Sequence, residues 1–271
     1  MSSNQINIFI LTLFPDFFEA FKNLGVVGQF LQGKRLENND VSVRFDVINI
    51  RNFALNKYAA VDDSPYGGGA GMVMRADILS RAVRVGVWEA FGLGKASDDL
   101  ATIKSKLHII IPTPRGSPWR HADAISTAKL STQKNLLFVC GRYEGIDERF
   151  ISLYGDACFS LGDFVLSGGE IAAMAMCDSF IRFIPGALGN PSSLHSESFN
   201  QDLLEYPQYT RPSIFEGIDV PKELLNGNHR DIELFQWKER MEKTKEVRPD
   251  LWLKFYSQFV PKNVLDDQPP S

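Results

Sequence analysis

The stretch that sets the fold class is Asn135–Cys140, NLLFVC, an apolar run that leads directly into the glycine-containing segment Gly141–Gly145, GRYEG. The run shows no alternation of apolar and polar positions. Such a run indicates a strand that is buried on both faces, as in a parallel sheet covered by helices. Glycines at the end of a strand allow a ligand to approach the backbone closely.

Further segments of the same kind extend this pattern along the first two-thirds of the chain. Three more apolar runs are bounded by proline, glycine, asparagine or charged residues: Ile6–Phe14, Val41–Ile50 and Leu107–Pro112. Helix-compatible segments lie between the apolar runs: Asp16–Asn23, Ala76–Phe91 and Ala122–Leu130. The alternation of strands and helices predicts an α/β domain with a parallel sheet.

The composition changes after residue 186, where glycine, serine and asparagine become frequent and periodicity disappears. We therefore expect an α/β domain over residues 1–186 and a flexible linker over residues 187–200. Residues 201–271 have little β signal. Within them, Asp231–Glu246 has the apolar spacing of a helix, and a second short helix is expected over Asp250–Phe259. The C-terminal part is thus predicted to be a small helical domain.

Composition and charge exclude several classes of protein. The chain has 271 residues, of which 44% are hydrophobic and 23% charged, as in ordinary globular proteins and unlike disordered chains or coiled coils. The net charge of −4 excludes a protein that binds nucleic acid through bulk positive charge, so a nucleic-acid partner would need a local patch. No apolar run reaches the ~20 residues of a membrane span, and Ile6–Phe14 lacks the basic leader of a signal peptide.

Cysteine and histidine residues give no sign of a metal site or a disulfide framework. The three cysteines, Cys140, Cys158 and Cys177, are few and widely spaced. The four histidines have no His-x-x-x-His spacing. We therefore expect a cytoplasmic protein without a structural metal.

Four segments combine glycine or proline with polar residues and are candidates for a ligand site: Asp62–Met74, Pro112–Pro118, Cys140–Arg149 and Ser160–Glu170. The last three include or closely follow β-rich stretches, and ligands gather at the carboxyl edge of open α/β sheets. None has the Gly-x-Gly-x-x-Gly pattern of a Rossmann fold or the Gly-Lys-Ser/Thr ending of a P-loop. One alternative is a nucleotide-dependent transferase that uses Asp62–Gly71 as a phosphate loop.

Five motifs, in chain order, closely resemble the bacterial tRNA (guanine-37-N1)-methyltransferase family: DDSPYGGGAGMVM, CGRYEGIDER, SLGDFVLSGGE, RFIPGALGN and YPQYTRP. The resemblance extends from about Ile6 to Trp252. It implies an N-terminal α/β domain with the trefoil knot of the SPOUT class, a helical tRNA-binding C-terminal domain, and a homodimer. It also implies methyl transfer from S-adenosyl-L-methionine to N1 of guanosine 37 in tRNA, next to the anticodon. The expected partner is tRNA, with no role for DNA or a membrane. The family is further expected to use Mg²⁺, although no acidic cluster in the sequence indicates its site.

The resemblance also assigns residues to the methyl donor, which is expected to bind mainly through backbone groups of three loops. These residues are Pro114, Arg115, Gly116, Gly141, Tyr143, Glu144, Gly145, Ser160, Leu161, Gly162, Asp163, Phe164, Val165, Leu166, Gly168 and Gly169. Candidates for RNA contacts are Arg182, the 187–200 segment, Tyr209–Pro212 and the Lys222–Lys254 region.

The chemistry requires a proton acceptor and a positive charge. Guanine N1 carries a proton, and negative charge develops on O6 when that proton leaves. By resemblance, Arg182 stabilises O6. Glu197, in Ser196–Phe199, stands where the family has the aspartate proposed as general base. Glutamate has a similar intrinsic pKa, ~4.3 against ~3.9, but a longer reach, so the alternative is an RNA-binding homologue with impaired catalysis.

Overall fold

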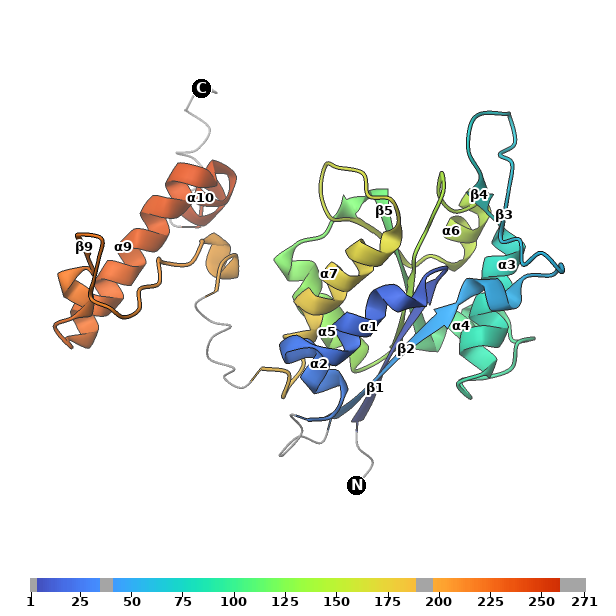
Figure 1. The fold of residues 1–271 in the computed structure, drawn as a ribbon, viewed down its shortest axis with the longest axis horizontal. Helices are drawn as coiled ribbons and strands as arrows, with labels where there is room; N and C mark the ends of the chain where they lie inside the picture. The colour runs from blue at the N-terminus through green and yellow to red at the C-terminus, as the bar shows by residue number, and fades with distance from the viewer. Residues whose placement is uncertain (1–3, 35–40, 189–196, 259–271) are drawn as a thin grey trace. The chain divides into compact units, whose positions relative to one another are not determined.

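The computed structural model describes residues 4–34, 41–188 and 197–258. The chain forms two compact units, Met1–Gly189 and Asn190–Ser271. The first unit contains a five-stranded sheet and the second consists mainly of helices (Figure 1). Among the residues described, no helix has the length and apolar character needed to cross a membrane.

The sheet of the first unit is parallel, with strand order β2-β1-β6-β5-β7. The strands are β1 (Asn4–Thr12), β2 (Val41–Asn49), β5 (Leu107–Pro118), β6 (Asn135–Val139) and β7 (Ala157–Ser160). The prediction of an α/β fold with a parallel sheet is confirmed, and four of these strands lie where the apolar runs predict them. The sequence analysis missed β7, because its four residues are only half-buried and too few to form an apolar run.

Both faces of the sheet are covered by helices, which explains why the strand sequences do not alternate. On β1, Ile8 and Ile10 pack into one core and Phe9 and Leu11 into the other. Each fully buried side chain of this size contributes about 1.5–3 kcal/mol. The first core is covered by η1 (Pro15–Phe18), α1 (Glu19–Asn23), α2 (Gly25–Leu31), α5 (His121–Ser131) and α7 (Gly169–Ile181) (Figure 1). The second is covered by η2 (Ile50–Phe53), α3 (Ala76–Arg81), η3 (Ala82–Glu89), α4 (Leu100–Lys106) and α6 (Glu148–Tyr154).

The glycine-rich segment at residues 62–74 forms a hairpin. Its strands are β3 (Asp62–Asp63) and β4 (Val73–Met74), and Gly67, Gly68, Gly69 and Gly71 in the connection all have positive φ. The hairpin is bonded to the loop after β6, since Met74 N donates to Gly145 O and Glu144 N to Met72 O, at 2.9 and 3.0 Å. Two of the motifs selected by sequence therefore lie side by side.

The second unit contains two main helices, α9 (His229–Val247) and α10 (Pro249–Tyr256), where the sequence predicts helices. Its smaller elements are η4 (Asn200–Asp202), η5 (Lys222–Leu224) and a hairpin that was not predicted, β8 (Ile214–Phe215) with β9 (Ile218–Asp219). Arg240 of α9 is buried, and its Nε donates to Leu204 O at 3.1 Å. Arg240 is therefore a structural residue, although it lies in the Lys222–Lys254 region expected to contact RNA.

Residues 189–196 of the predicted linker lie outside the described residues. Its last residues, 197–200, are bonded to the second unit. Glu205 N donates to Ser198 Oγ at 3.0 Å, Phe199 N donates to Leu203 O at 2.7 Å, and Arg240 Nη2 donates to Asn200 O at 3.3 Å. The backbone around Glu197 is thus part of a hydrogen-bonded turn.

Candidate functional site

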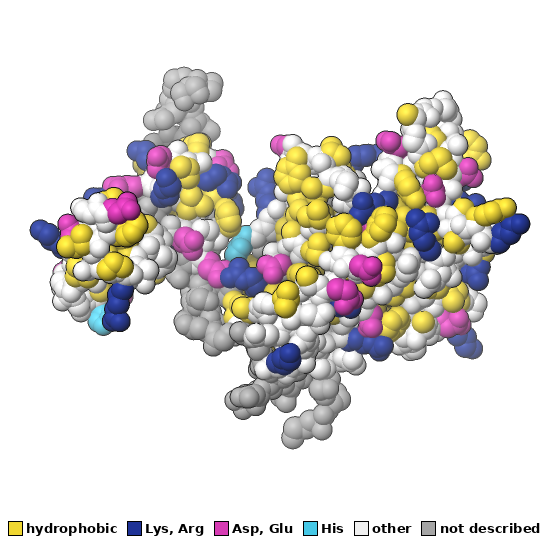
Figure 2. Space-filling view, viewed as in Figure 1, with side chains coloured by type: hydrophobic (Ala, Val, Ile, Leu, Met, Phe, Trp, Pro, Cys, Tyr) yellow, Lys and Arg dark blue, Asp and Glu magenta, His cyan; other side chains and the backbone are white. Residues whose placement is uncertain are grey.

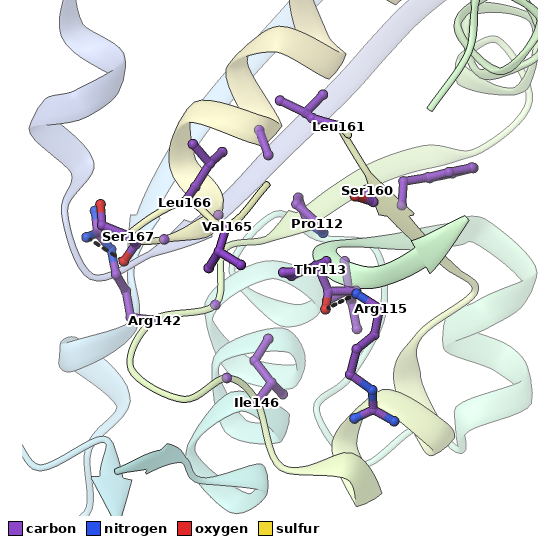
Figure 3. Close-up of a pocket in the computed structure, with 18 of the residues that line it drawn as sticks. Pro112, Thr113, Arg115, Arg142, Ile146, Ser160, Leu161, Val165, Leu166 and Ser167 are labelled. Carbon is purple, nitrogen blue, oxygen red and sulfur yellow. Dashed lines mark hydrogen bonds between the residues drawn. The ribbon is translucent and has the colours of Figure 1, made fainter. Parts of the chain in front are cut away.

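Three loops of the first unit meet at one edge of the sheet, because β6, β5 and β7 are parallel neighbours and their carboxyl ends lie together. The loops enclose a cavity of about 270 Å³ (Figure 3), close to the lower end of the ~300–1,000 Å³ usual for ligand pockets. The cavity is lined by Ile111–Arg115, Gly141–Ile146, Ile151, Phe159–Leu161, Phe164–Gly169 and Ala172.

The first loop is a bulge in β5. Pro112 and Ser117 both pair with Phe159 of β7, so the four residues between them are excluded from the ladder. Gly116 lies at the end of the bulge, where a Cβ would be 2.4 Å from Phe159 N and 2.5 Å from Cys158 C. Only glycine fits there, because both neighbours are backbone atoms of the adjacent strand.

The second loop, after β6, is bonded to the start of α7. Gly169 N donates to Gly141 O at 2.9 Å, and a Cβ on Gly169 would lie 2.9 Å from Cys140 Cα. Tyr143 and Gly145 have positive φ values of 59° and 123°, which turn the loop back towards the β3–β4 hairpin. Close backbone packing thus explains Gly169, and the positive φ explains Gly145.

The third loop, after β7, is a tight turn. Ser160 Oγ donates to Gly162 O at 3.0 Å, and Phe164 N donates to the same oxygen at 2.9 Å. Beyond the turn, the side chains of Phe164 and Val165 are 57% and 81% exposed. The loop therefore places exposed apolar side chains at the mouth of the cavity. Exposing this apolar surface to water is unfavourable, and a bound ligand or partner would cover it.

Charged groups on the cavity wall are few. Arg142 Nη1 donates to Ser167 O at 3.1 Å, and Arg115 N donates to Thr113 Oγ1 at 3.3 Å (Figure 3). The Arg115 guanidinium pairs with Glu148 at 2.9 Å in an exposed position, where an ion pair contributes little stability. Behind the wall, Arg142 Nε lies 2.9 Å from Glu170 Oε2.

The combination of apolar side chains and backbone polar groups suits a flat heterocycle, whose faces are apolar and whose edge forms hydrogen bonds. Leu161, Val165 and Leu166 provide apolar surface, and at Gly141, Gly145 and Gly168 the wall is main chain without a side chain. Next to the cavity, burial raises the pKa of the Cys140 thiol well above its ordinary value. Cys140 is therefore a neutral packing residue rather than a nucleophile.

All the residues predicted to bind the donor line this cavity except Gly116, Gly162 and Asp163. Gly116 contributes instead by allowing β5 and β7 to approach each other. Sequence reasoning missed Arg142 and Ser167, which also line the cavity. Arg142 lies in the motif CGRYEGIDER and Ser167 in SLGDFVLSGGE, so the motifs indicated the region of both residues. The hydrogen bond between them could not be predicted from the sequence. The assignment of these residues to the donor stays a prediction.

The two predicted catalytic residues belong to different units. Arg182 follows the last residue of α7 and is half-buried. Glu197 is half-buried at the start of the turn that precedes η4 in the second unit. In the part of the chain that the structure describes, no three His, Cys, Asp or Glu side chains are grouped closely enough to hold a metal ion. The use of Mg²⁺ stays a prediction.

Comparison with known proteins agrees with the motifs. The sequence model of the tRNA (guanine-1)-methyltransferase family, TrmD, matches residues 6–254. The chain belongs to this family. It is 43% identical to the tRNA (guanine-N(1)-)-methyltransferase of Geobacter sulfurreducens over 242 residues, 89% of each chain. It is 42% identical to that of Thermosipho africanus, covering 92% of this chain and 91% of the relative, and 38% identical to that of Staphylococcus aureus, covering 94% of each.

Membership of the tRNA (guanine-1)-methyltransferase family bears on the site in two ways. The matched residues include all three cavity loops and both catalytic candidates, Arg182 and Glu197. Membership also favours methyl transfer over the alternative of a phosphate loop at Asp62–Gly71. That segment is instead the exposed hairpin bonded to the second cavity loop.

Proposed function

We propose that this protein transfers the methyl group of S-adenosyl-L-methionine to N1 of guanosine 37 in tRNA. The observation that carries the proposal is the cavity at the carboxyl edge of the sheet. This chain belongs to the tRNA (guanine-1)-methyltransferase family, and its cavity contains Pro114, Gly141, Ser160 and Leu166, which the family resemblance assigns to the methyl donor. When bound, the donor supplies a methyl group on a positively charged sulfur.

The residues of the cavity fit such a donor. Leu161 and Leu166 give the adenine ring apolar contacts, and the glycine-rich loops offer backbone groups to its edge. Phe164 stands where many relatives have tyrosine, which is compatible with contact through the main chain.

The proposed reaction divides the chemistry between Glu197 and Arg182. The carboxylate of Glu197 accepts the proton of guanine N1, and Arg182 stabilises the negative charge that develops on O6. The N1 lone pair then forms a bond to the methyl carbon while the carbon–sulfur bond breaks, which leaves S-adenosylhomocysteine. Hydrogen bonds hold the main chain around Glu197 in a turn. Glutamate has one methylene more than aspartate, and this extra length therefore has to be accommodated by the conformation of the side chain rather than by movement of the main chain.

A methyl-transfer assay with tRNA transcripts that differ only at position 37 tests the function. We expect methylation of the G37 transcript, none of the A37 transcript, and roughly micromolar binding of S-adenosylhomocysteine by calorimetry, about −8 kcal/mol. Tight tRNA binding without methylation would instead identify the impaired homologue. Binding of a nucleoside triphosphate, without binding of S-adenosylhomocysteine, would identify the phosphate-loop transferase.

We further propose the trefoil knot and the homodimer that the family resemblance implies, in the cytoplasm. The proposal of the knot follows from membership of the family. Exposed apolar side chains beside the cavity support the dimer: Phe14, Phe17, Tyr143, Phe164 and Val165. Figure 2 shows hydrophobic side chains gathered across one face of the first unit. Sedimentation equilibrium should give twice the mass of the chain, and Val165→Glu should lower that mass towards one chain.

A further inference from the structure

A buried carboxylate lies directly behind the wall of the cavity. Glu170, the second residue of α7, has no exposed surface and does not line the cavity. Its Oε1 accepts a 2.7 Å hydrogen bond from the Thr12 hydroxyl at the end of β1. Its Oε2 lies 2.9 Å from Arg142 Nε. Neither of these two atoms has an aligned hydrogen bond within the described ranges, so the contact is an ion pair.

Arg142 connects this carboxylate to the cavity. Its Nη1 donates to Ser167 O at 3.1 Å, and its guanidinium carbon lies 4.5 Å from the centre of the Phe14 ring. Gly168 packs so closely that a Cβ there would lie 2.3 Å from Arg142 Nε. Arg142 is therefore held between Glu170, an aromatic ring and the backbone of the third cavity loop.

The arrangement gives each residue a separate task. Ser167 and Gly168 line the cavity, but their backbone lies outside any helix or strand. The hydrogen bond from Arg142 restrains this backbone by holding the carbonyl oxygen of Ser167. The Arg142 side chain is only 15% exposed, and a guanidinium so far removed from water needs a balancing charge, which Glu170 provides at 2.9 Å in the described structure.

We propose that Glu170 is a positioning residue of the donor site. It fixes Arg142, and Arg142 holds the Ser167 carbonyl so that the segment Leu166–Gly168 keeps the conformation that closes the cavity. Glu170 itself touches neither donor nor tRNA. The inference rests on the proposed function in one respect, the identity of the ligand in the cavity.

The test compares Glu170→Gln with the parent chain. Glutamine keeps the shape of the side chain and a bond to Thr12 but removes the charge that holds Arg142. We expect the dissociation constant of S-adenosylhomocysteine, measured by calorimetry, and the KM for the donor to rise at least ~10-fold, about 1.4 kcal/mol. The kcat at saturating donor should stay within about threefold, since no group of the reaction is altered. Glu170→Asp, which keeps the charge, should recover part of the affinity.

A double variant separates positioning from stability. Removing one partner of a buried ion pair is destabilising, whereas replacing both is often neutral. The double variant Glu170→Gln with Arg142→Met should therefore regain the Tm lost by Glu170→Gln but keep the weakened donor binding, because the bond to Ser167 is still absent. If donor affinity returns together with Tm, the proposal is wrong. If Glu170→Gln alone does not fold, the donor affinity of the double variant still tests the proposal.

Asp156→Asn is the matched control. The side chain of Asp156 is 17% exposed, pairs with Lys104 at 3.2 Å and accepts from Ile109 N at 2.9 Å, but Asp156 precedes the amino end of β7. It should lower Tm without changing donor affinity. If Glu170→Gln lowers Tm without changing donor affinity, as expected for Asp156→Asn, Glu170 has only a structural role. The inference is then wrong, whereas the proposed function is unaffected. If the parent chain does not bind S-adenosylhomocysteine, the proposed function and the inference are both wrong.

Discussion

The main-chain N–H of Gly169 donates a 2.9 Å hydrogen bond to the carbonyl oxygen of Gly141. This bond joins the first residue of α7 to the loop after β6, two segments that line the same cavity. The backbones can approach this closely because Gly169 has no side chain; a Cβ on Gly169 would lie 3.0 Å from Gly141 N. Contacts between backbones thus shape the candidate donor site, and they require glycine at positions 116 and 169.

Gly116→Ala should damage the site through the backbone. The new Cβ would lie 2.4 Å from Phe159 N, so β5 and β7 would have to separate, at a cost of about 1–3 kcal/mol. We expect a lower Tm and weaker binding of S-adenosylhomocysteine. Gly86→Ala is the control, because Gly86 lies in η3, outside the cavity, and its Cβ would lie 2.3 Å from the Phe53 ring. It should lower Tm without weakening the binding of S-adenosylhomocysteine, and an equal loss of that binding in both variants would contradict this explanation.

Glu197→Gln should lower methyl transfer by roughly 10²–10⁴-fold in single-turnover conditions, because the proton acceptor is lost. Donor affinity should not change. Glu197→Asp should retain or raise activity, since it restores the residue of the family, and the exposed Glu205→Gln is a control of equal charge change. A parent-like rate for Glu197→Gln would show that Glu197 is not the base. The remaining candidates would then be His195, outside the described residues, and Asp202, which already accepts bonds from Lys254 and Gln258.

Arg182→Ala should lower turnover by roughly 10²–10³-fold, the usual effect of removing one donor to a developing oxyanion. Apparent affinity for tRNA should also fall, because a cation next to the substrate is lost. Arg182→Lys should keep part of both, since it retains the charge but not the planar pair of donors. Filter binding and single-turnover assays measure the two effects. Arg81→Ala, at an exposed arginine of α3, should change neither.

Stability should fall as the pH drops below neutrality, in part through His108. Burial lowers the pKa of His108 below its ordinary value of 6.5; Lys134 and Lys104 act in the same direction and Asp156 opposes them. The unfolded chain therefore takes up the proton first. The free energy of unfolding should decrease as the pH falls from about 7 through 6.5, and the decrease should end below the folded-state pKa. Urea unfolding at several pH values should give a flatter profile for His108→Gln; an unchanged profile would contradict the assignment.

The sequence alone determined the fold class, because burial on both faces requires a local composition that is visible in NLLFVC and LHIIIP. It also located the cavity loops, since glycines that permit backbone contacts lie within short motifs. Local sequence patterns did not predict the exact conformation where contacts with neighbouring elements determine it. The segment predicted as one helix over Ala76–Phe91 is an α-helix, Ala76–Arg81, followed by a π-helix, Ala82–Glu89.

Only the tertiary structure decided which polar groups are paired. Nothing in the local pattern around Arg142 or Glu170 indicates that they form an ion pair, or that Thr12, far away in sequence, completes the contact. These contacts follow from the strand order β2-β1-β6-β5-β7, which brings the ends of β1 and β6 and the start of α7 together. Strand order is set by long-range packing of both cores, whereas composition and periodicity report only on a residue's own segment.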